Sequence, residues 1–249
     1  MQLQAENRDS IWKQLIECLP STADEVGVAI RESLVAAGYL HVTWPMSMEN
    51  YEQIAGRLGT IVLRSDVKVD LERAHNQEQV RHIRGRGGIY SPSPLLLHTD
   101  PNADLVSWYC VEQDETGGPM LMLDTGNLEE HFSLQELEIL SRVDLWSPSR
   151  KSEAEPETLT AAPLLSRKNG RYRIFYAPWL LRDSYDSDAN RVLEKFVAYL
   201  EKLEKNQLIT LPIRKHDTIF IDNGRMLHGR GALPAASRRH LVRLYLRAA

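Results

Sequence analysis

Apolar residues recur at helical spacing in three stretches of the N-terminal portion, within about 11–19, 26–38 and 51–58. Residues 39–44 lie between the second and third stretches, are rich in β-forming side chains and predict a short strand. Capping residues precede the last two helical stretches, and a glycine closes each of them. These patterns predict a largely helical N-terminal portion that covers about residues 1–60.

The next segment has a different pattern. Residues 60–63 predict a short strand, and about 64–94 are then charged and rich in Gly and Pro, which predicts a loop. A loop of this length in a compact domain is often a lid or a binding segment. A disordered basic connector is an equally good interpretation. The sequence therefore predicts a loop or lid segment and leaves its role open.

From residue 95 onward, apolar residues fall mainly in short runs rich in β-forming side chains. We expect strands at 95–97, 105–111, 120–123, 164–167, 172–176, 208–213, 218–222 and 239–246. Asn169-Gly170 predicts a tight hairpin between two of these strands. Further helices are expected at about 133–140 and 193–203. The sum is a mainly β chain with flanking helices, of the α+β class.

Composition narrows the class of protein. A chain of 249 residues is compatible with one large domain, so we expect a single domain over 1–249. A net charge of -4 and a pI near 6.1 argue against general attraction to nucleic acids or membranes. Two cysteines make no disulfide framework, and the polar N-terminus lacks the pattern of a signal peptide. We therefore expect a cytoplasmic protein that acts on a small molecule, with its oligomeric state left open.

His98 and Asp100 form the first candidate for chemistry. Residues two apart on a strand point to the same side, so both side chains can reach one ion. The pair alone is weak evidence, because eight His and 34 acidic residues give about one such pair by chance. A surface histidine beside an acidic loop is the alternative interpretation.

A second imidazole strengthens the case. His228 follows the apolar run 218–222, which ends abruptly in Asp222-Asn223-Gly224, and this placement suits the mouth of a cavity. Taken alone, His228 is better explained as a core or turn histidine. Two His and one carboxylate on one face of a metal leave open positions, which suits a non-heme Fe(II) oxygenase.

Two arginines follow His228, at 11 and 15 positions further along the chain. On a strand, Arg239 and Arg243 share a face with Leu241 and Tyr245, opposite the apolar face that begins at His240. The arginine face is either solvated or functional. In the functional interpretation, Arg239 forms a bidentate pair with a carboxylate, which suits the guanidinium fork.

From about Tyr39 to the C-terminus, the chain resembles the Fe(II)/2-oxoglutarate-dependent dioxygenases of the taurine dioxygenase and clavaminate synthase type. The resemblance is carried by residues 38–42, 58–62, His98-Thr99-Asp100, Thr116-Gly117-Gly118, 216–230, and the pair Arg239 and Arg243. Residues 216–230 are its most specific part. More weakly, Gly85-Arg86-Gly87 resembles the carbapenem synthase branch.

The resemblance implies a distorted jelly-roll, the double-stranded β-helix of the cupin type. It also implies roles for individual residues: iron ligands at His98, Asp100 and His228, and a partner for the distal carboxylate of 2-oxoglutarate at Arg239. The implied reactants are Fe(II), 2-oxoglutarate and O2. One departure is Met120, which stands where relatives often carry a Thr that hydrogen-bonds 2-oxoglutarate.

The resemblance further implies oxidation of an unactivated C–H bond, with hydroxylation as the default and desaturation or cyclisation as alternatives. Arg243 matches a position that helps to bind an anionic substrate in relatives, and Arg86 and Tyr90 are further candidates for substrate contacts. We predict a small polar, anionic or amino-acid-like metabolite, in natural-product biosynthesis. A non-catalytic ligand-binding protein of the same β fold is the alternative from another class. A zinc hydrolase with the same three ligands leaves the arginine spacing unexplained.

Overall fold

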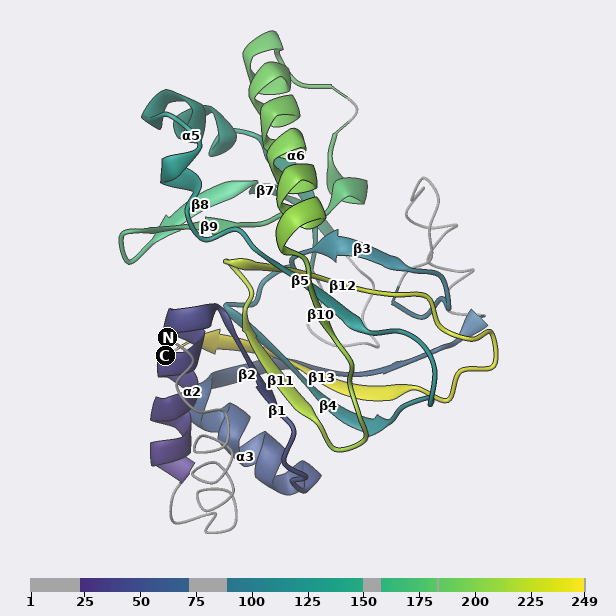
Figure 1. The fold of residues 1–249 in the computed structure, drawn as a ribbon. Coiled ribbons are helices and arrows are strands. Elements are labelled where there is room, and N and C mark those ends of the chain that lie inside the picture. Colours follow the sequence, from purple (N-terminus) through teal and green to yellow (C-terminus); the bar gives the residue numbers. More distant parts are fainter. Residues whose placement is uncertain (1–22, 72–88, 150–157, 183, 249) are drawn as a thin grey trace.

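Two antiparallel sheets form the centre of the computed structural model, which describes residues 23–71, 89–149, 158–182 and 184–248 (Figure 1). The larger sheet has the strand order β1 (Tyr39–Val42), β11 (Thr218–Asp222), β4 (Leu105–Glu112), β13 (His240–Ala248) and β2 (Gly59–Lys68). The smaller sheet has the order β10 (Ile209–Leu211), β5 (Met120–Asp124), β12 (Met226–Arg230) and β3 (Leu95–His98). The two sheets make the predicted jelly-roll, the double-stranded β-helix.

The inner faces of the two sheets share one apolar core. Trp108 and Ile219 from the larger sheet pack in the same cluster as Met122 from the smaller sheet, and all three are buried. Burying a side chain of this size contributes about 1.5–3 kcal/mol relative to leaving it in water. This core therefore holds the sheets together and fixes the position of any polar side chain between them.

A layer of two helices covers the outer face of the larger sheet: α2 (Ala23–Ala37) and α3 (Met48–Leu58) (Figure 1). The Ser47 hydroxyl accepts a hydrogen bond from the Asn50 backbone N–H at 3.1 Å and caps α3, as the sequence predicts. Apolar residues of both helices pack against the outward side chains of β13, which are Val242, Leu244 and Leu246. The side chains of β13 are thus buried on both of its faces.

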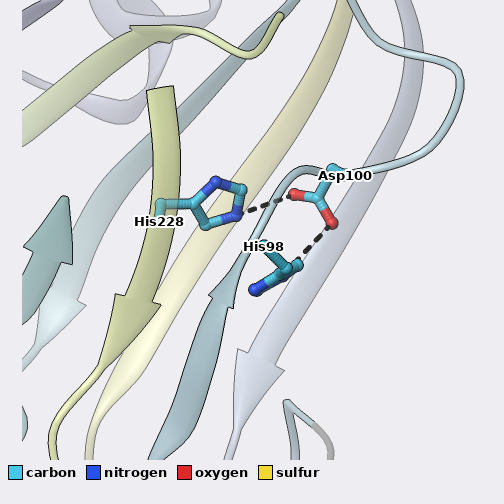
Figure 2. Close-up of side chains that lie close together, drawn as sticks. All are labelled: His98, Asp100 and His228. Atoms are coloured by element: carbon cyan, nitrogen blue, oxygen red, sulfur yellow. Dashed lines mark ion pairs between the residues drawn. The ribbon is translucent and has the colours of Figure 1, made fainter. Parts of the chain in front are cut away.

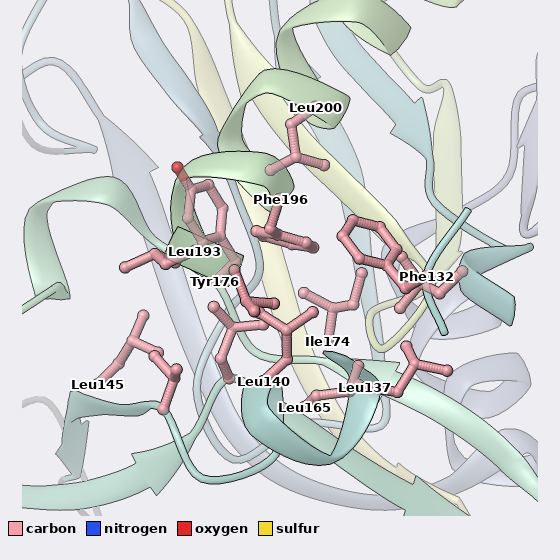
Figure 3. Close-up of a cluster of buried hydrophobic side chains, with 14 of the residues drawn as sticks. Phe132, Leu137, Leu140, Leu145, Leu165, Ile174, Tyr176, Leu193, Phe196 and Leu200 are labelled. Carbon is pink, nitrogen blue, oxygen red and sulfur yellow. The ribbon is translucent and has the colours of Figure 1, made fainter. Parts of the chain in front are cut away.

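A second layer, made of helices and two small two-stranded sheets, covers the outer face of the smaller sheet (Figure 1). Its elements are η1 (Leu128–Glu130), α5 (Leu134–Leu140), β6 (Asp144–Ser149), β7 (Thr158–Pro163), β8 (Leu165–Lys168), β9 (Arg171–Ile174), η2 (Pro178–Leu180) and α6 (Ser187–Gln207). Phe196 and Leu200 of α6 pack with Leu140 of α5 and with Tyr176 in one apolar cluster (Figure 3). This cluster anchors the segment around Tyr176, whose backbone is hydrogen-bonded to that of Thr99.

The predicted hairpin at Asn169-Gly170 is confirmed. The strands β8 and β9 pair across it, and both turn residues have positive φ, 51° and 78°. Such a turn needs φ > 0 at its central residues, which Asn and Gly tolerate best. The capping box at Ser133 and Glu136 before α5 is also present.

One sequence prediction needs correction, and three strands were not predicted. The loop predicted from residue 64 begins later, because β2 continues to Lys68 and pairs with β13 along its length. The strand β12 was not predicted, since it carries a glycine and two polar residues within five positions. The pair β6–β7 was also missed. The predicted helix near 11–19 and most of the predicted loop, 72–88, lie outside the described residues.

In the described ranges, no helix combines the length and the apolar character that a membrane span requires.

Candidate metal centre and anion pocket

Two adjacent strands bring the two imidazoles together. His98 is the last residue of β3 and His228 is the middle residue of β12, and the two are directly paired in the register of these strands. Their ring centroids are 4.4 Å apart. The sequence had placed His228 just beyond an apolar strand, but it lies within a strand of its own. Cross-strand pairing therefore sets the separation of the two rings.

Asp100 completes the cluster from the loop after β3 (Figure 2). Its Oδ2 lies 3.3 Å from Nε2 of His228, and its Oδ1 lies 3.9 Å from Nε2 of His98. One ligand atom from each of the three residues falls within 4.8 Å of the others, and all three side chains are buried. The structure thus brings together the two His and the carboxylate that the sequence singled out.

The loop that carries Asp100 is held by its neighbours. The side-chain oxygen of Asn223 accepts from the Asp100 backbone N–H at 2.9 Å, and its amide donates to the Asp100 carbonyl at 2.8 Å. Thr99 and Tyr176 exchange backbone and hydroxyl hydrogen bonds on the other side. The apolar cluster beneath α6 therefore fixes the backbone around Asp100.

The donor atoms suit a divalent cation. Nδ1 of His98 contacts the Leu96 carbonyl at 2.8 Å, and since a carbonyl only accepts, Nε2 keeps its lone pair for a ligand. Both ring nitrogens of His228 are buried, and within the described part of the chain neither makes a well-aligned hydrogen bond, with Nε2 lying 3.3 Å from Oδ2 of Asp100. A buried polar group without a partner costs about 1–3 kcal/mol, which a bound cation would offset. Two imidazoles and one carboxylate match the facial set of Fe(II) oxygenases.

Burial and neighbouring charges set the ionisation of the cluster. Burial, followed by the proximity of His228, lowers the pKa of His98 to about 3, so its ring is neutral near pH 7. Burial alone would raise the pKa of Asp100, but the charge of Arg243 and then the contacts with the two imidazoles hold it well below its usual range. A neutral imidazole and an ionised carboxylate are the forms that bind metals.

Arg243 and Tyr245 reach the same carboxylate from β13. Nη1 of Arg243 lies 3.3 Å from each oxygen of Asp100, and its Nε donates to the Ser65 hydroxyl at 3.3 Å. The Tyr245 hydroxyl donates to Oδ1 of Asp100 at 2.7 Å. Sequence reasoning placed Arg243 in the site but gave no role to Tyr245 beyond its shared face. Only the fold brings β13 and the Asp100 loop together.

A pocket extends from the two imidazoles toward the start of β13. It is lined by both imidazoles, by the apolar residues Trp108, Met120 and Leu241, and by the cations Arg230, Arg239 and Arg243. The Arg239 side chain is 4% exposed and donates to the Gly118 carbonyl. A Cβ on Gly118 would lie 2.7 Å from Nη1 of Arg239, so the Gly-Gly turn allows this close approach. Met120 is buried there and adds an apolar wall.

Arg230 is a third buried cation in the pocket, and sequence reasoning did not single it out. It follows His228 by two positions on β12 and donates to the carbonyls of Ser91 and Ser93 at 2.6 and 2.9 Å. Neither Arg230 nor Arg239 has a carboxylate within ion-pair distance among the residues that the structure describes. Burial lowers the pKa of each to about 10, and the charge of Arg239 adds to the effect on Arg230.

The other predicted site residues are placed less directly. Tyr90 is buried, and its carbonyl accepts from the Asp70 N–H at 2.9 Å, while its neighbour Ile89 lines the pocket. Arg86 lies outside the described residues. Two aromatic rings border the imidazoles. The ring centroid of Trp108 is 4.9 Å from that of His228, and the ring centroid of Trp179 is 5.0 Å from that of His98. The β-forming run 105–111 had indicated a strand, but not that Trp108 faces the metal site.

Comparison with known families decides the class. Residues 21–245 match the model of the taurine catabolism dioxygenase TauD, TfdA family. The chain belongs to this family. It is therefore a dioxygenase of the Fe(II)- and 2-oxoglutarate-dependent type, as the sequence predicts. A comparison with curated protein sequences finds no match.

Solved structures agree on the fold of this TauD/TfdA family chain. The non-heme iron oxygenase OrfP in complex with Fe and alpha-ketoglutaric acid has a TM-score of 0.67 at 16% identity, over 94% of this chain and 84% of that chain. An asparagine oxygenase in complex with Fe(II), 3-hydroxyasparagine and succinate has a TM-score of 0.65 at 14% identity, over 91% and 79%. At such identities, the likeness shows a shared fold and not a shared substrate.

Proposed function

We propose that this dioxygenase binds Fe(II) through His98, Asp100 and His228, binds 2-oxoglutarate through Arg239, and hydroxylates a small amino-acid-like or carboxylate-bearing metabolite. The observation that carries the proposal is the pairing of two unlike features in one pocket. One is a buried cluster of two imidazoles and a carboxylate, and the other is a buried guanidinium without a carboxylate partner in the described residues. A metal and a dicarboxylate together supply what both features lack.

When bound, Fe(II) with 2-oxoglutarate and O2 supplies the oxidation of a C–H bond and leaves succinate and CO2. The chain's own residues place and shield this chemistry. Arg239 holds the far carboxylate with its guanidinium fork, and the Gly118 carbonyl fixes that fork from behind. Trp108 and Met120 are apolar and line the pocket between the metal cluster and Arg239, where they exclude water.

The ligands of similar structures support an amino acid as substrate. OrfP has been solved in complex with Fe, succinate and (3S)-hydroxy-L-Arg, and the asparagine oxygenase with 3-hydroxyasparagine. These are ligands of those proteins, and we extend only the class, a free amino acid or a related acid, to this chain. Arg243, Arg86 and Tyr90 remain predicted substrate contacts, and a cytoplasmic location remains a prediction.

A screen for succinate release tests the proposal. The purified protein is supplied with Fe(II), 2-oxoglutarate, ascorbate and O2, and then with free amino acids and related carboxylic acids one at a time. We expect one acid to raise succinate formation well above the background and to gain 16 mass units, the mass of one oxygen atom. A loss of two mass units would instead indicate desaturation or ring closure. Protein that binds ligands but forms no succinate with any acid, or in the background reaction, would contradict the proposal.

The matched control is His228→Ala, which removes one imidazole of the cluster. We expect this variant to lose both the substrate-dependent and the background succinate formation, because a metal held by two remaining side chains binds far less tightly. Equal succinate formation by this variant and the wild-type protein would mean that the three-residue cluster is not the metal site.

A further inference from the structure

The two oxygens of Asp100 have different surroundings. Oδ1 accepts a hydrogen bond of 2.7 Å from the Tyr245 hydroxyl and lies 3.9 Å from Nε2 of His98, whereas Oδ2 lies closer to its imidazole, 3.3 Å from Nε2 of His228. Arg243 does not distinguish the two, because its Nη1 is 3.3 Å from both. Among these contacts, the Tyr245 hydroxyl is therefore the one that selects a single oxygen on the side of β13.

We propose that Tyr245 is a positioning residue that holds Oδ1 of Asp100 and leaves Oδ2 as the oxygen that faces the metal. The inference rests on the proposed function, since it assigns Asp100 to the metal. A carboxylate can bind a cation through one oxygen or through both. When one oxygen is occupied by a hydroxyl, binding through both is disfavoured, and one more position at the metal stays open for 2-oxoglutarate or O2.

The packing of Tyr245 supports a fixed position for its hydroxyl. The side chain lies on the inward face of β13, where the residue is 8% exposed, and it belongs to the core cluster between the two sheets. The guanidinium of Arg243 lies over its ring, 4.6 Å from the centroid. The ring thus supports Arg243 while the hydroxyl orients Asp100, so the two residues act on one carboxylate in different ways.

The residues that hold Asp100 lie close together in the sequence. Arg243 and Tyr245 are two positions apart and share one face of β13, and Arg239 directly precedes this strand. The same segment therefore supplies a carboxylate-binding guanidinium just before the strand and two groups within the strand that hold the metal-binding carboxylate. A Phe at position 245 would keep the ring and remove only the selecting hydroxyl.

Tyr245→Phe tests the inference, and Tyr51→Phe is the matched control. Tyr51 is also buried, and its hydroxyl is 2.8 Å from the Ser107 hydroxyl, on the outer side of the larger sheet. Co(II) is titrated anaerobically into each metal-free protein, and the visible absorption of bound Co(II) reports its coordination at saturation. We expect Tyr245→Phe to weaken Co(II) binding about 10- to 100-fold and to change the spectrum. Tyr51→Phe should leave affinity and spectrum as in the wild-type protein.

The outcomes separate this inference from the proposed function. If the wild-type protein and both variants bind Co(II) with the same affinity and the same spectrum, Tyr245 does not position Asp100, and the inference is overturned while the metal site stands. If the wild-type protein itself binds no Co(II) or Fe(II), the proposed function fails, and the inference fails with it. The spectrum at saturating metal remains decisive when the loss of a hydroxyl lowers stability, because it is read on folded, loaded protein.

Discussion

The two ends of the pocket differ in how their charges are balanced. At the metal end, the carboxylate of Asp100 already has Arg243 at 3.3 Å and the Tyr245 hydroxyl at 2.7 Å. At the other end, Arg230 and Arg239 are buried with carbonyls as their partners, and the described residues place no carboxylate beside them. The first end is balanced by the protein itself. The second carries excess positive charge, which is the property of a site for an anion.

This difference indicates which end of the pocket binds the far carboxylate of the ligand. A dicarboxylate such as 2-oxoglutarate has one end for the metal and one for a cation, and the pocket separates these two functions. Arg239 contacts the Gly118 carbonyl and has no carboxylate partner among the described residues, whereas the guanidinium of Arg243 already contacts Asp100 and Ser65. An anionic substrate that used Arg243 would have to share it with Asp100.

The largest expected effect comes from removing the buried guanidinium of Arg239. Arg239→Ala should raise the dissociation constant for 2-oxoglutarate at least about 30-fold, because truncating one partner of a buried charge pair costs about 2–5 kcal/mol. Isothermal titration of the Co(II)-loaded protein measures it. Arg238→Ala is the control, since its side chain is 77% exposed beside Glu112. Equal losses in the two variants would remove the distinction between the two ends of the pocket.

At the metal end, the corresponding change is Asn223→Ala. The Asn223 side chain makes hydrogen bonds to the Asp100 N–H and to the carbonyls of Asp100 and Ala103, and its loss leaves these buried groups unpaired. We expect the free energy of unfolding to fall by about 2–4 kcal/mol and metal binding to weaken. Thermal and urea unfolding measure the first quantity. Asn206→Ala, on the exposed face of α6, should change it by less than about 0.5 kcal/mol. An equally small effect for Asn223→Ala would contradict this account.

A smaller effect is expected at the contact between the strands of the two imidazoles. A Cβ on Gly229 would lie 2.6 Å from the Leu95 carbonyl oxygen, so Gly229→Ala forces β12 away from β3. We expect a loss of about 1–3 kcal/mol in stability together with weaker metal binding. In contrast, Gly56→Ala in α3 meets no atom within 4 Å and should stabilise the protein by about 0.5–1 kcal/mol. A Gly229→Ala protein with unchanged metal affinity would show that this strand contact does not set the site.

The smallest effect is expected from Arg230→Lys, which keeps the charge but loses the planar guanidinium. In that group, Nη2 donates to the carbonyls of Ser91 and Ser93, and Nη1 donates to the Gly231 carbonyl. We expect the affinity for 2-oxoglutarate to fall about 3- to 10-fold, which corresponds to roughly 1 kcal/mol. The effect is small because the positive charge remains and only a hydrogen bond to the Ser91 and Ser93 carbonyls is lost. Arg171→Lys, on the exposed side of the hairpin, serves as the control. A loss as large as that of Arg239→Ala would mean that Arg230 itself binds the carboxylate.

Sequence patterns predicted the strands reliably where the buried residues are apolar. The strands β4 and β11 are runs of apolar, β-forming residues, and both were predicted almost to the residue. The pattern failed at β12, because polar His228 and Arg230 are buried there and Gly229 interrupts the β-forming run. On β13, alternation identified the two faces, but not that the arginine face is enclosed by a second sheet.

The candidate site was predictable in its residues more than in its contacts. Motif spacing singled out His98, Asp100 and His228, and the structure brings them together. The partners of Asp100 could not be inferred, because Asn223 lies 123 positions away and Tyr245 lies 145 positions away. Such contacts depend on which strands become neighbours, and local sequence does not encode this directly.

The most direct test of the central claim is a crystal structure of the protein grown anaerobically with Fe(II) and 2-oxoglutarate, with data collected at the iron absorption edge. We predict one anomalous peak bonded to Nε2 of His98, Nε2 of His228 and one oxygen of Asp100, with the far carboxylate of 2-oxoglutarate on Arg239. An iron peak elsewhere, or a 2-oxoglutarate whose far carboxylate avoids Arg239, would contradict the account.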